Sequence, residues 1–195
     1  MNPPGSPAAR SGTDARARRT IVLIAAIAVA PVILAYFAYH YWPRTARTNY
    51  GELLRAQTLP HITGTALAGG AFDSGTLRGK WLVLFAAPGG CDPACQQALY
   101  ASRQARTIQN AERDRVQRVW LLTDAAAPAP ALLAEHPDLV VAKVAPAALA
   151  ALPRGLGVMY LVDPLGNLVL AWPANPDIKA MSKDLTKLLH ASQIG

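Results

Sequence analysis

Hydrophobic residues follow two different patterns along the chain. The 22 residues from Ile21 to Trp42 carry no formal charge, and a helix of that length, at about 1.5 Å per residue, covers the ~30 Å hydrocarbon core of a bilayer. Beyond this segment, short apolar runs alternate with stretches rich in glycine, proline and polar residues. The two patterns predict one membrane-spanning helix followed by a single globular domain of ordinary size.

The flanks of the apolar segment predict how it lies in a membrane. Arginine is concentrated before it, at Arg10, Arg16, Arg18 and Arg19, whereas Arg44 and Arg47 follow it. This asymmetry places the N-terminus in the cytoplasm and the rest of the chain in the periplasm of a bacterial inner membrane. A cleaved signal peptide is the alternative, but the apolar run is longer than usual and no small-x-small cleavage site follows it. We therefore expect an uncleaved anchor.

Four segments follow from these patterns. They are a cytoplasmic tail at 1–20, a transmembrane anchor at 21–42, a juxtamembrane linker at 43–60 and a globular domain at 61–195. The formal net charge is +7, and several of the arginines lie in the tail. In the domain the densest charged run, residues 112–115, alternates in sign, so we expect no nucleic-acid partner. The sequence leaves the oligomeric state open.

The order of apolar runs in the domain predicts an α/β fold. A hairpin is expected at 61–79, a central strand buried on both faces at 81–86, a helix at 93–113, a strand at 116–122, a short helix at 131–136, a weak strand near a sheet edge at 139–144 and a strand hairpin at 158–172. A last helix is expected with Asn175 as its cap and Pro176 at its first position. This order predicts a thioredoxin-like mixed sheet with helices on both sides.

The chain has two cysteines, Cys91 and Cys95, four residues apart just after the central strand. Two cysteines inside one regular helix would lie too far apart for a relaxed disulfide, so we expect Cys91 to lie outside the helix. Asp92 can cap that helix and Pro93 suits its first position, which puts Cys95 in the first turn. The helix dipole favours a thiolate there, while the Asp92 carboxylate opposes it. The structural alternative is a permanent disulfide, which constrains the unfolded chain little over so short a loop.

Four motifs carry a family resemblance. They are Gly79–Phe85, Cys91-x-x-x-Cys95, Val119–Asp124 and Tyr160–Asn167, in order over roughly residues 65–189. Together with the anchor they resemble the SCO/SenC family of membrane-anchored thioredoxin-fold proteins. The resemblance implies a role in assembling cytochrome c oxidase, either by carrying copper to its dinuclear centre or by keeping the cysteines of that centre reduced. Two thiolates and a histidine, as in the family motif, suit copper in either oxidation state.

The sequence departs from the family at two places and from thioredoxins at a third. Pro93 lies in the middle of the cysteine motif, where the family usually has proline directly after the first cysteine. Gly155 occupies the position of the family histidine, and Leu156-Gly157-Val158 replaces the proline that thioredoxins carry before the strand facing the cysteines. Other soft or imidazole donors have simpler explanations: we expect core packing for Met159, the membrane interface for His40, a surface position for His61 and His136, and helix capping for His190.

Three functions remain open. The first is thiol–disulfide exchange on an oxidase assembly partner by Cys91 and Cys95, which would make the chain an oxidoreductase needing no cofactor. In the second, the same two cysteines carry Cu(I) as a chaperone. In the third, the domain is a non-catalytic assembly scaffold with a structural disulfide. Heme maturation by a TlpA-like reductant is a weaker redox alternative, because of the cysteine spacing.

Overall fold

The computed structural model describes residues 11–41 and 49–192. Its contacts divide the chain into two compact units, Met1–Arg47 and Thr48–Gly195, and each unit is described by itself. The N-terminal unit contains helix α1 (Ser11–Tyr41), which has Pro31 in its interior. Within the described residues, its Arg16–Tyr41 part is the one helix that is long and apolar enough to cross a membrane.

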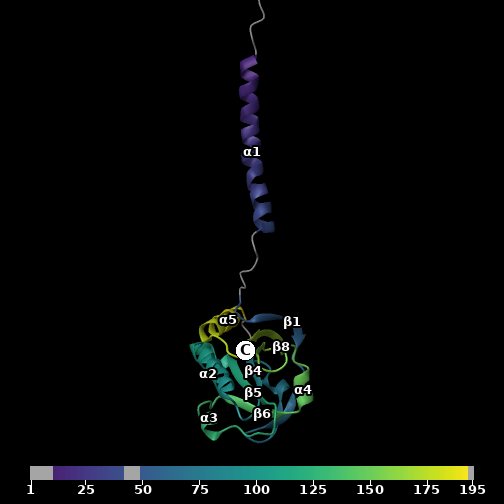
Figure 1. Cartoon of the computed structure of the whole chain (residues 1–195), viewed down its shortest axis with the longest axis vertical. Helices are drawn as coiled ribbons and strands as arrows, with labels where there is room; N and C mark the ends of the chain where they lie inside the picture. The colour runs from purple at the N-terminus through teal and green to yellow at the C-terminus, as the bar shows by residue number, and fades with distance from the viewer. Residues whose placement is uncertain (1–10, 42–48, 193–195) are drawn as a thin grey trace, which may run out of the picture. The chain divides into compact units, whose positions relative to one another are not determined.

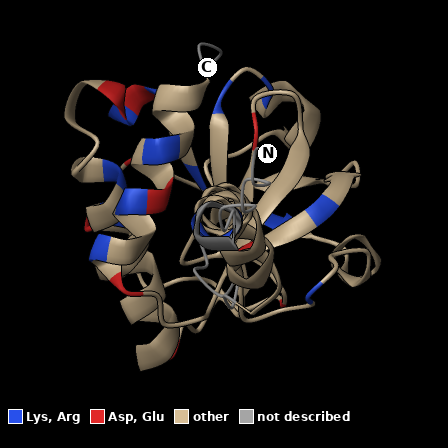
Figure 2. Cartoon of the chain, turned by 90° about the horizontal axis from the view of Figure 1, so that it is seen from above, with Lys and Arg blue, Asp and Glu red and all other residues tan. Residues whose placement is uncertain are grey.

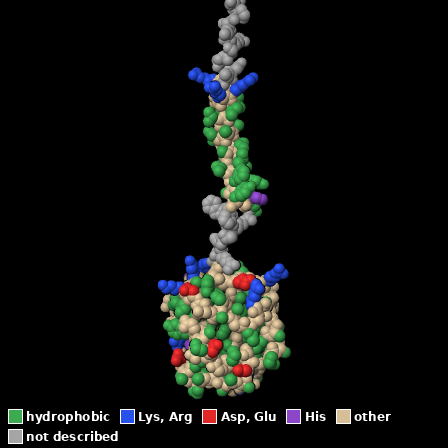
Figure 3. Space-filling view, viewed as in Figure 1, with side chains coloured by type: hydrophobic (Ala, Val, Ile, Leu, Met, Phe, Trp, Pro, Cys, Tyr) green, Lys and Arg blue, Asp and Glu red, His purple; other side chains and the backbone are tan. Residues whose placement is uncertain are grey.

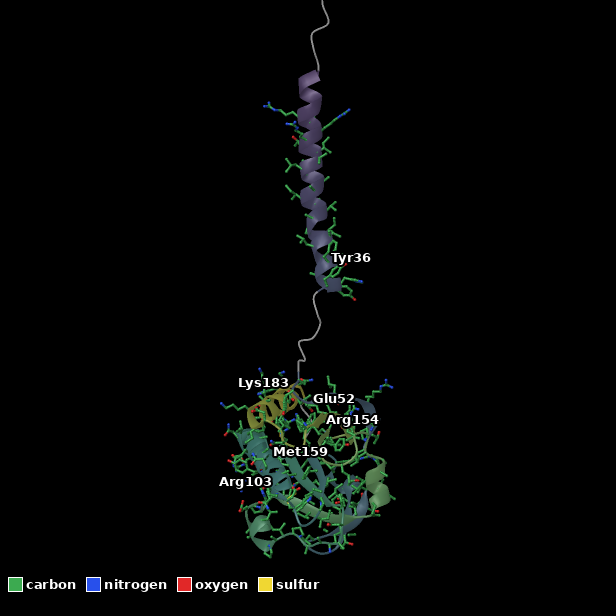
Figure 4. All side chains as sticks on the ribbon, viewed as in Figure 1. Tyr36, Glu52, Arg103, Arg154, Met159 and Lys183 are labelled. Atoms are coloured by element: carbon green, nitrogen blue, oxygen red, sulfur yellow. A yellow bond between two sulfur atoms is a disulfide. The ribbon has the colours of Figure 1, made fainter. Side chains whose placement is uncertain are left out.

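Helix α1 covers nearly all of the predicted span. It begins at Ser11, so the second half of the segment predicted as a tail is helical, and Trp42, the last residue of the predicted span, lies outside the described residues. Tyr36 stacks on His40 and Phe37 stacks on Tyr41, with ring centroids 5.6 Å apart in both pairs. Tyr36 therefore belongs to an aromatic group at the C-terminal end of α1 (Figure 4), as is typical of a membrane interface.

The described part of the C-terminal unit contains an eight-stranded mixed sheet with the order β1-β8-β7-β4-β5-β6-β2-β3. Its strands are β1 (Glu52–Thr58), β2 (Thr63–Ala66), β3 (Ala71–Asp73), β4 (Trp81–Ala87), β5 (Val116–Leu122), β6 (Leu139–Val144), β7 (Met159–Val162) and β8 (Asn167–Trp172). Strands β4, β5 and β6 are parallel, and the other pairings are antiparallel. The predicted hairpins and the thioredoxin-like mixed sheet are confirmed.

Helices cover the two faces of this sheet. They are α2 (Pro93–Thr107), α3 (Pro130–Ala134), α4 (Pro146–Ala150) and α5 (Ile178–Ala191), with short 3₁₀ turns η1 (Ser74–Leu77) and η2 (Asn110–Arg115). Strand β4 is buried along its whole length. Its residues Val83 and Phe85 pack with α2 and α5, whereas Leu82 and Leu84 pack on the other face with Leu149 of α4. Figure 1 shows α2 and α5 adjoining on one side of the sheet and α4 on the other.

Several elements differ from the sequence expectation. The segment predicted as a linker, 43–60, contains β1, an edge strand whose side chains are largely exposed and show no apolar alternation. Strand β6 is not at an edge, because β2 pairs with its free side. Helix α2 ends at Thr107, before Asn110 takes a left-handed φ of 51°. The cap of α5 is Asp177, not Asn175, because the Asp177 carboxylate accepts the Ala180 N–H at 2.7 Å.

Basic and acidic residues are interspersed on the domain. In the view of Figure 2, Lys and Arg alternate with Asp and Glu along neighbouring helices. Arg115 pairs with Glu112 in η2, and the buried Arg118 contacts Asp138 at 3.2 Å. The alternating charge signs of residues 112–115 therefore correspond to local pairing between opposite charges. That no nucleic acid binds stays a prediction.

Candidate functional site

The loop that carries the cysteines is held at the C-terminal end of β4. The Gly89 N–H donates to the Asp124 carboxylate at 2.8 Å, across to the end of β5. A side chain at position 89 would meet the Ala126 carbonyl oxygen at 1.9 Å, so only glycine fits this approach. The indole N–H of Trp120 donates to the Ala87 carbonyl at 3.2 Å. These contacts fix the turn from β4 into the cysteine motif.

Cys91 and Cys95 form a disulfide with their Cα atoms 5.2 Å apart. Cys91 lies outside α2, as expected, and takes a left-handed φ of 35°. Its N–H donates to the Pro88 carbonyl at 3.2 Å, and its own carbonyl accepts the Gln96 side-chain amide at 3.0 Å. The backbone on both sides of Cys91 is therefore hydrogen-bonded, which holds the unusual conformation in place.

Asp92 and Pro93 begin α2 as the sequence predicts. The Asp92 carboxylate accepts the Cys95 N–H at 2.8 Å, and Pro93 occupies the first helical position. Cys95 therefore lies in the first turn, at the end of the helix where the unpaired backbone N–H groups and the dipole favour negative charge. After reduction of the disulfide, this position favours the thiolate form of Cys95 over the neutral thiol.

Both sulfur-bearing residues are buried but adjoin a pocket. Cys91 is 3% exposed and Cys95 is 6% exposed. They line a cavity of about 590 Å³, whose other walls include Phe85, Pro88, Leu156 and Ala174. The walls are mainly apolar, so the pocket suits a hydrophobic side chain next to an attacking or leaving sulfur.

The loop before β7 forms one wall of this pocket. Gly155 and Gly157 both have a positive φ, and Leu156 between them is 54% exposed. The Tyr160 hydroxyl donates to the Gly155 carbonyl at 2.8 Å and accepts the Arg154 N–H at 2.9 Å. Burial raises the pKa of this phenol. Tyr160 thus anchors the loop, and the residues that reach the pocket from it are Leu156 and Gly157.

The histidines lie elsewhere. His40 is on α1, His61 is exposed and contacts Asp73 at 2.8 Å, and His190 is exposed near the end of α5. The expected surface position of His136 is wrong: it is buried, with Nδ1 3.3 Å from an Arg118 guanidinium nitrogen. Burial, and then the charge of Arg118, lowers the pKa of His136 to about 4, so its imidazole is neutral at pH 7.

The described residues do not gather a set of metal ligands around the cysteines. Across 11–41 and 49–192, no group of three or more His, Cys, Asp or Glu side chains is placed to hold a metal ion. Met159 is fully buried in the core, as expected, inside the sheet (Figure 4). The soft donors among the residues that line the pocket are the sulfurs of Cys91 and Cys95, which suit a soft monovalent ion in linear coordination.

Sequence reasoning found the cysteines, the cap and the helix start but missed the pocket. Ala174 and Leu156 are distant from the cysteines along the chain, and neither type of residue indicates a site on its own. The two glycines that flank Leu156 are the one available signal, because they indicate a backbone with positive φ at the strand start.

A family comparison adds to this geometry. The family described as "Transmembrane-like, thioredoxin-like, C-terminal domain" matches residues 81–192, from β4 through α5. The chain belongs to this family. A search of curated proteins found no significant match.

Solved structures share the fold of this family member. Yeast Sco1 with copper bound is 19% identical, with 71% of this chain and 96% of that chain covered and a TM-score of 0.58. BsSco, described as a Sco family cytochrome c oxidase assembly protein with a disulfide switch, is 12% identical, with 73% and 96% covered and a TM-score of 0.59. The thioredoxin domain of a thiol-disulfide oxidoreductase from Bacteroides vulgatus is 16% identical, with 71% and 99% covered and a TM-score of 0.53. The resemblance to SCO proteins thus holds for the fold.

Proposed function

We propose that this chain is a membrane-anchored thiol–disulfide exchange protein that acts on an assembly partner of cytochrome c oxidase. The observation that carries the proposal is the Cys91–Cys95 disulfide, which lies at the start of α2 and lines an apolar pocket. The fold shared with BsSco, whose description names oxidase assembly and a disulfide switch, supports the choice of partner.

The exchange uses both cysteines. In the reduced protein, the Cys91 thiolate attacks a disulfide of the partner, forms a mixed disulfide and releases one partner thiolate, which takes up a proton. The Cys95 thiolate, favoured by the N-terminus of α2, then attacks Cys91 and releases the second partner thiolate. The partner gains two electrons, and this chain is left with the disulfide that the structure shows. The reverse sequence oxidises a partner dithiol.

The pocket indicates which partner segments fit. Phe85, Pro88 and Leu156 place apolar surface beside the two sulfurs. A partner cysteine flanked by a hydrophobic residue can bury that residue there while its sulfur approaches the disulfide. The pocket thus favours a hydrophobic cysteine-bearing segment over a small soluble thiol such as glutathione.

Copper carriage by the same two cysteines is the second candidate. Two thiolates suit Cu(I), and yeast Sco1, with the same fold, has been solved with copper bound. Copper would then be the cargo. The loop before β7 presents Leu156 and Gly157 at the pocket, so neither residue supplies the third, imidazole ligand that would favour Cu(II).

The location of the chain completes the proposal. The Arg-rich segment before the apolar part of α1 is cytoplasmic, the apolar helix is an uncleaved anchor in a bacterial inner membrane, and the domain from residue 48 onward is periplasmic. An oxidising compartment is consistent with a disulfide that forms and persists there. A structural disulfide in a non-catalytic scaffold is the outcome that the following experiment can establish instead.

The first experiment measures whether the native disulfide can be reduced. The full chain in nanodiscs is treated with dithiothreitol without denaturant, and free thiols are counted by alkylation and mass spectrometry. Exchange predicts reduction within minutes, and oxidised glutathione should then leave Cys95→Ser as a stable mixed disulfide at Cys91 while the wild type closes its own disulfide. A disulfide that is reduced only after unfolding would refute thiol exchange and support the non-catalytic scaffold with a structural disulfide.

The second experiment separates copper carriage from exchange. The reduced full chain is titrated anaerobically with Cu(I) against a competing chelator, with Cys91→Ser, Cys95→Ser as the matched control. One tightly held copper per chain that is lost in the control would support the copper carrier. Binding no greater than in the control would remove copper from the function.

A further inference from the structure

Residues 50 and 51, near the start of the C-terminal unit, are hydrogen-bonded to a side chain of α5. The Asp184 carboxylate is buried and accepts the Tyr50 N–H at 3.1 Å, the Gly51 N–H at 2.8 Å and the Trp172 indole N–H at 3.0 Å. The Tyr50 hydroxyl accepts the Asp177 N–H at 3.0 Å. A side chain at Gly51 would lie 2.8 Å from the Trp172 ring, so glycine is required there. Residues 50 and 51 are thus clamped to α5.

The chain between α1 and this clamp is short. Eight residues separate Tyr41, which ends α1, from Tyr50. Nine Cα–Cα steps reach at most about 30 Å, so the tether between the two units is short. The eight residues contain Arg44 and Arg47 and no acidic residue. If α1 spans a membrane, α5 stays within reach of its headgroups.

Helix α5 carries a row of exposed lysines. Lys179, Lys183 and Lys187 repeat every four residues, which places them along one face of the helix. Together with Ile108 they line an open groove of about 620 Å³ beside the end of α2. The acidic residue of α5, Asp184, is used in the clamp, and Asp177, just before the helix, is its cap. In the described chain, Lys179 and Lys183 form no ion pair.

The figures show where this row lies on the domain. Lys183 projects from α5 at the rim of the domain (Figure 4), on the same side as the β1 edge strand. In the space-filling view, basic side chains lie along this rim with acidic ones between them (Figure 3). The clamp and the lysine row thus belong to the same helix and the same side of the C-terminal unit.

We propose that the lysine face of α5, formed by Lys179, Lys183 and Lys187, docks on anionic phospholipid headgroups of the membrane that α1 spans. Each lysine near an anionic surface strengthens binding by about fivefold, and the short chain to the clamp keeps this face at a high local concentration near the lipid. The docking needs no cysteine chemistry and therefore stands or falls separately from thiol exchange.

The test compares lysine reactivity in two kinds of nanodisc. The full chain is placed in phosphatidylcholine alone or in phosphatidylcholine mixed with phosphatidylglycerol, and the acetylation rate of each lysine is followed by mass spectrometry. Lys179 and Lys183 should react at least fivefold more slowly in the anionic discs, and high salt should abolish this protection. Lys143 on β6, across the sheet from the β1 edge, is the internal reference. Equal rates relative to Lys143 in both discs would overturn the proposal.

A pair of variants tests whether the charges act together. Lys179→Gln with Lys183→Gln should remove most of the difference between the Lys187 acetylation rates in the two kinds of disc, whereas Lys80→Gln with Lys143→Gln should leave that difference unchanged. All four positions are exposed, so thermal unfolding should be the same for both variants and the wild type. Undiminished protection of Lys187 in the first variant would also refute the proposal, since another surface would then face the lipid.

Discussion

Asp92 combines two effects that substitution can separate. Its carboxylate caps α2 through the Cys95 N–H at 2.8 Å, and the same carboxylate places a negative charge beside the cysteines. Asp92→Asn keeps an oxygen that can accept the N–H and removes the charge. Asp92→Ala removes both. Comparing the two variants therefore distinguishes the structural effect of the cap from the electrostatic effect on the thiols.

The expected magnitudes differ between the variants. Loss of a cap costs about 1 kcal/mol of stability, so Asp92→Ala should lower the thermal midpoint by roughly 2–4 °C, whereas Asp92→Asn should change it little. Removing the charge stabilises a thiolate in both variants. The Asp92 carboxylate accepts a hydrogen bond from the Cys95 backbone, so we take about 1.4 kcal/mol as the repulsion between this carboxylate and a thiolate. Removing that repulsion corresponds to a roughly tenfold larger thiolate fraction at neutral pH.

The assay measures two quantities on the reduced full chain. Thermal unfolding followed by circular dichroism gives stability, and the rate of iodoacetamide alkylation as a function of pH gives the thiolate population. Faster alkylation in both variants with a lower midpoint in Asp92→Ala alone would confirm the separation. If Asp92→Asn alkylates at the wild-type rate, the carboxylate does not control the thiols and the electrostatic argument fails.

Three further predictions concern neighbouring parts of the domain. Leu156→His should add an imidazole at the pocket without backbone strain, so that the reduced protein binds Cu(II) with a visible thiolate-to-copper absorption band that Leu156→Asn lacks. Asp184→Asn should lower the unfolding free energy by about 3 kcal/mol in a urea titration, because one side-chain oxygen replaces two that serve three donors. Because the pKa of His136 is about 4 when folded and near 6.5 when unfolded, the unfolded state binds more protons between these values. Stability should therefore fall as the pH drops from about 6.5 to about 4, and His136→Gln should flatten that fall.

Local signals in the sequence predicted most of the site. The continuous apolar run of β4 identifies a strand buried on both faces, and the Asp92-Pro93 pair identifies the start of a helix that must leave Cys91 outside it. Both inferences depend on residues that are adjacent in the chain. For the same reason, these two inferences are correct although the predicted ends of some other elements are wrong.

The features that escaped prediction depend on distant residues. Strand β6 lies inside the sheet only because β2, more than 70 residues earlier, pairs with it. Strand β1 is held by β8 and has no apolar alternation of its own. His136 is buried because Arg118 and the neighbouring elements surround it. Composition and periodicity carry no information on such pairings, since they describe a segment and not its neighbours.

The choice between thiol exchange and a structural disulfide depends on how much stability the Cys91–Cys95 bond contributes. Linking two residues four apart restricts the unfolded chain and raises its free energy by only about 2 kcal/mol. The Asp92 cap, the Gly89 contact and the Gln96 hydrogen bond already define the local conformation. A disulfide needed only for stability would also gain from a closed surface above it. Instead, a loop anchored by Tyr160 borders an apolar hollow at the two sulfurs. The hollow gives an attacking thiol access to the bond in the folded protein, and a partner segment that fills the hollow gains apolar contacts that a small reductant lacks, which is the selectivity that an exchange protein requires.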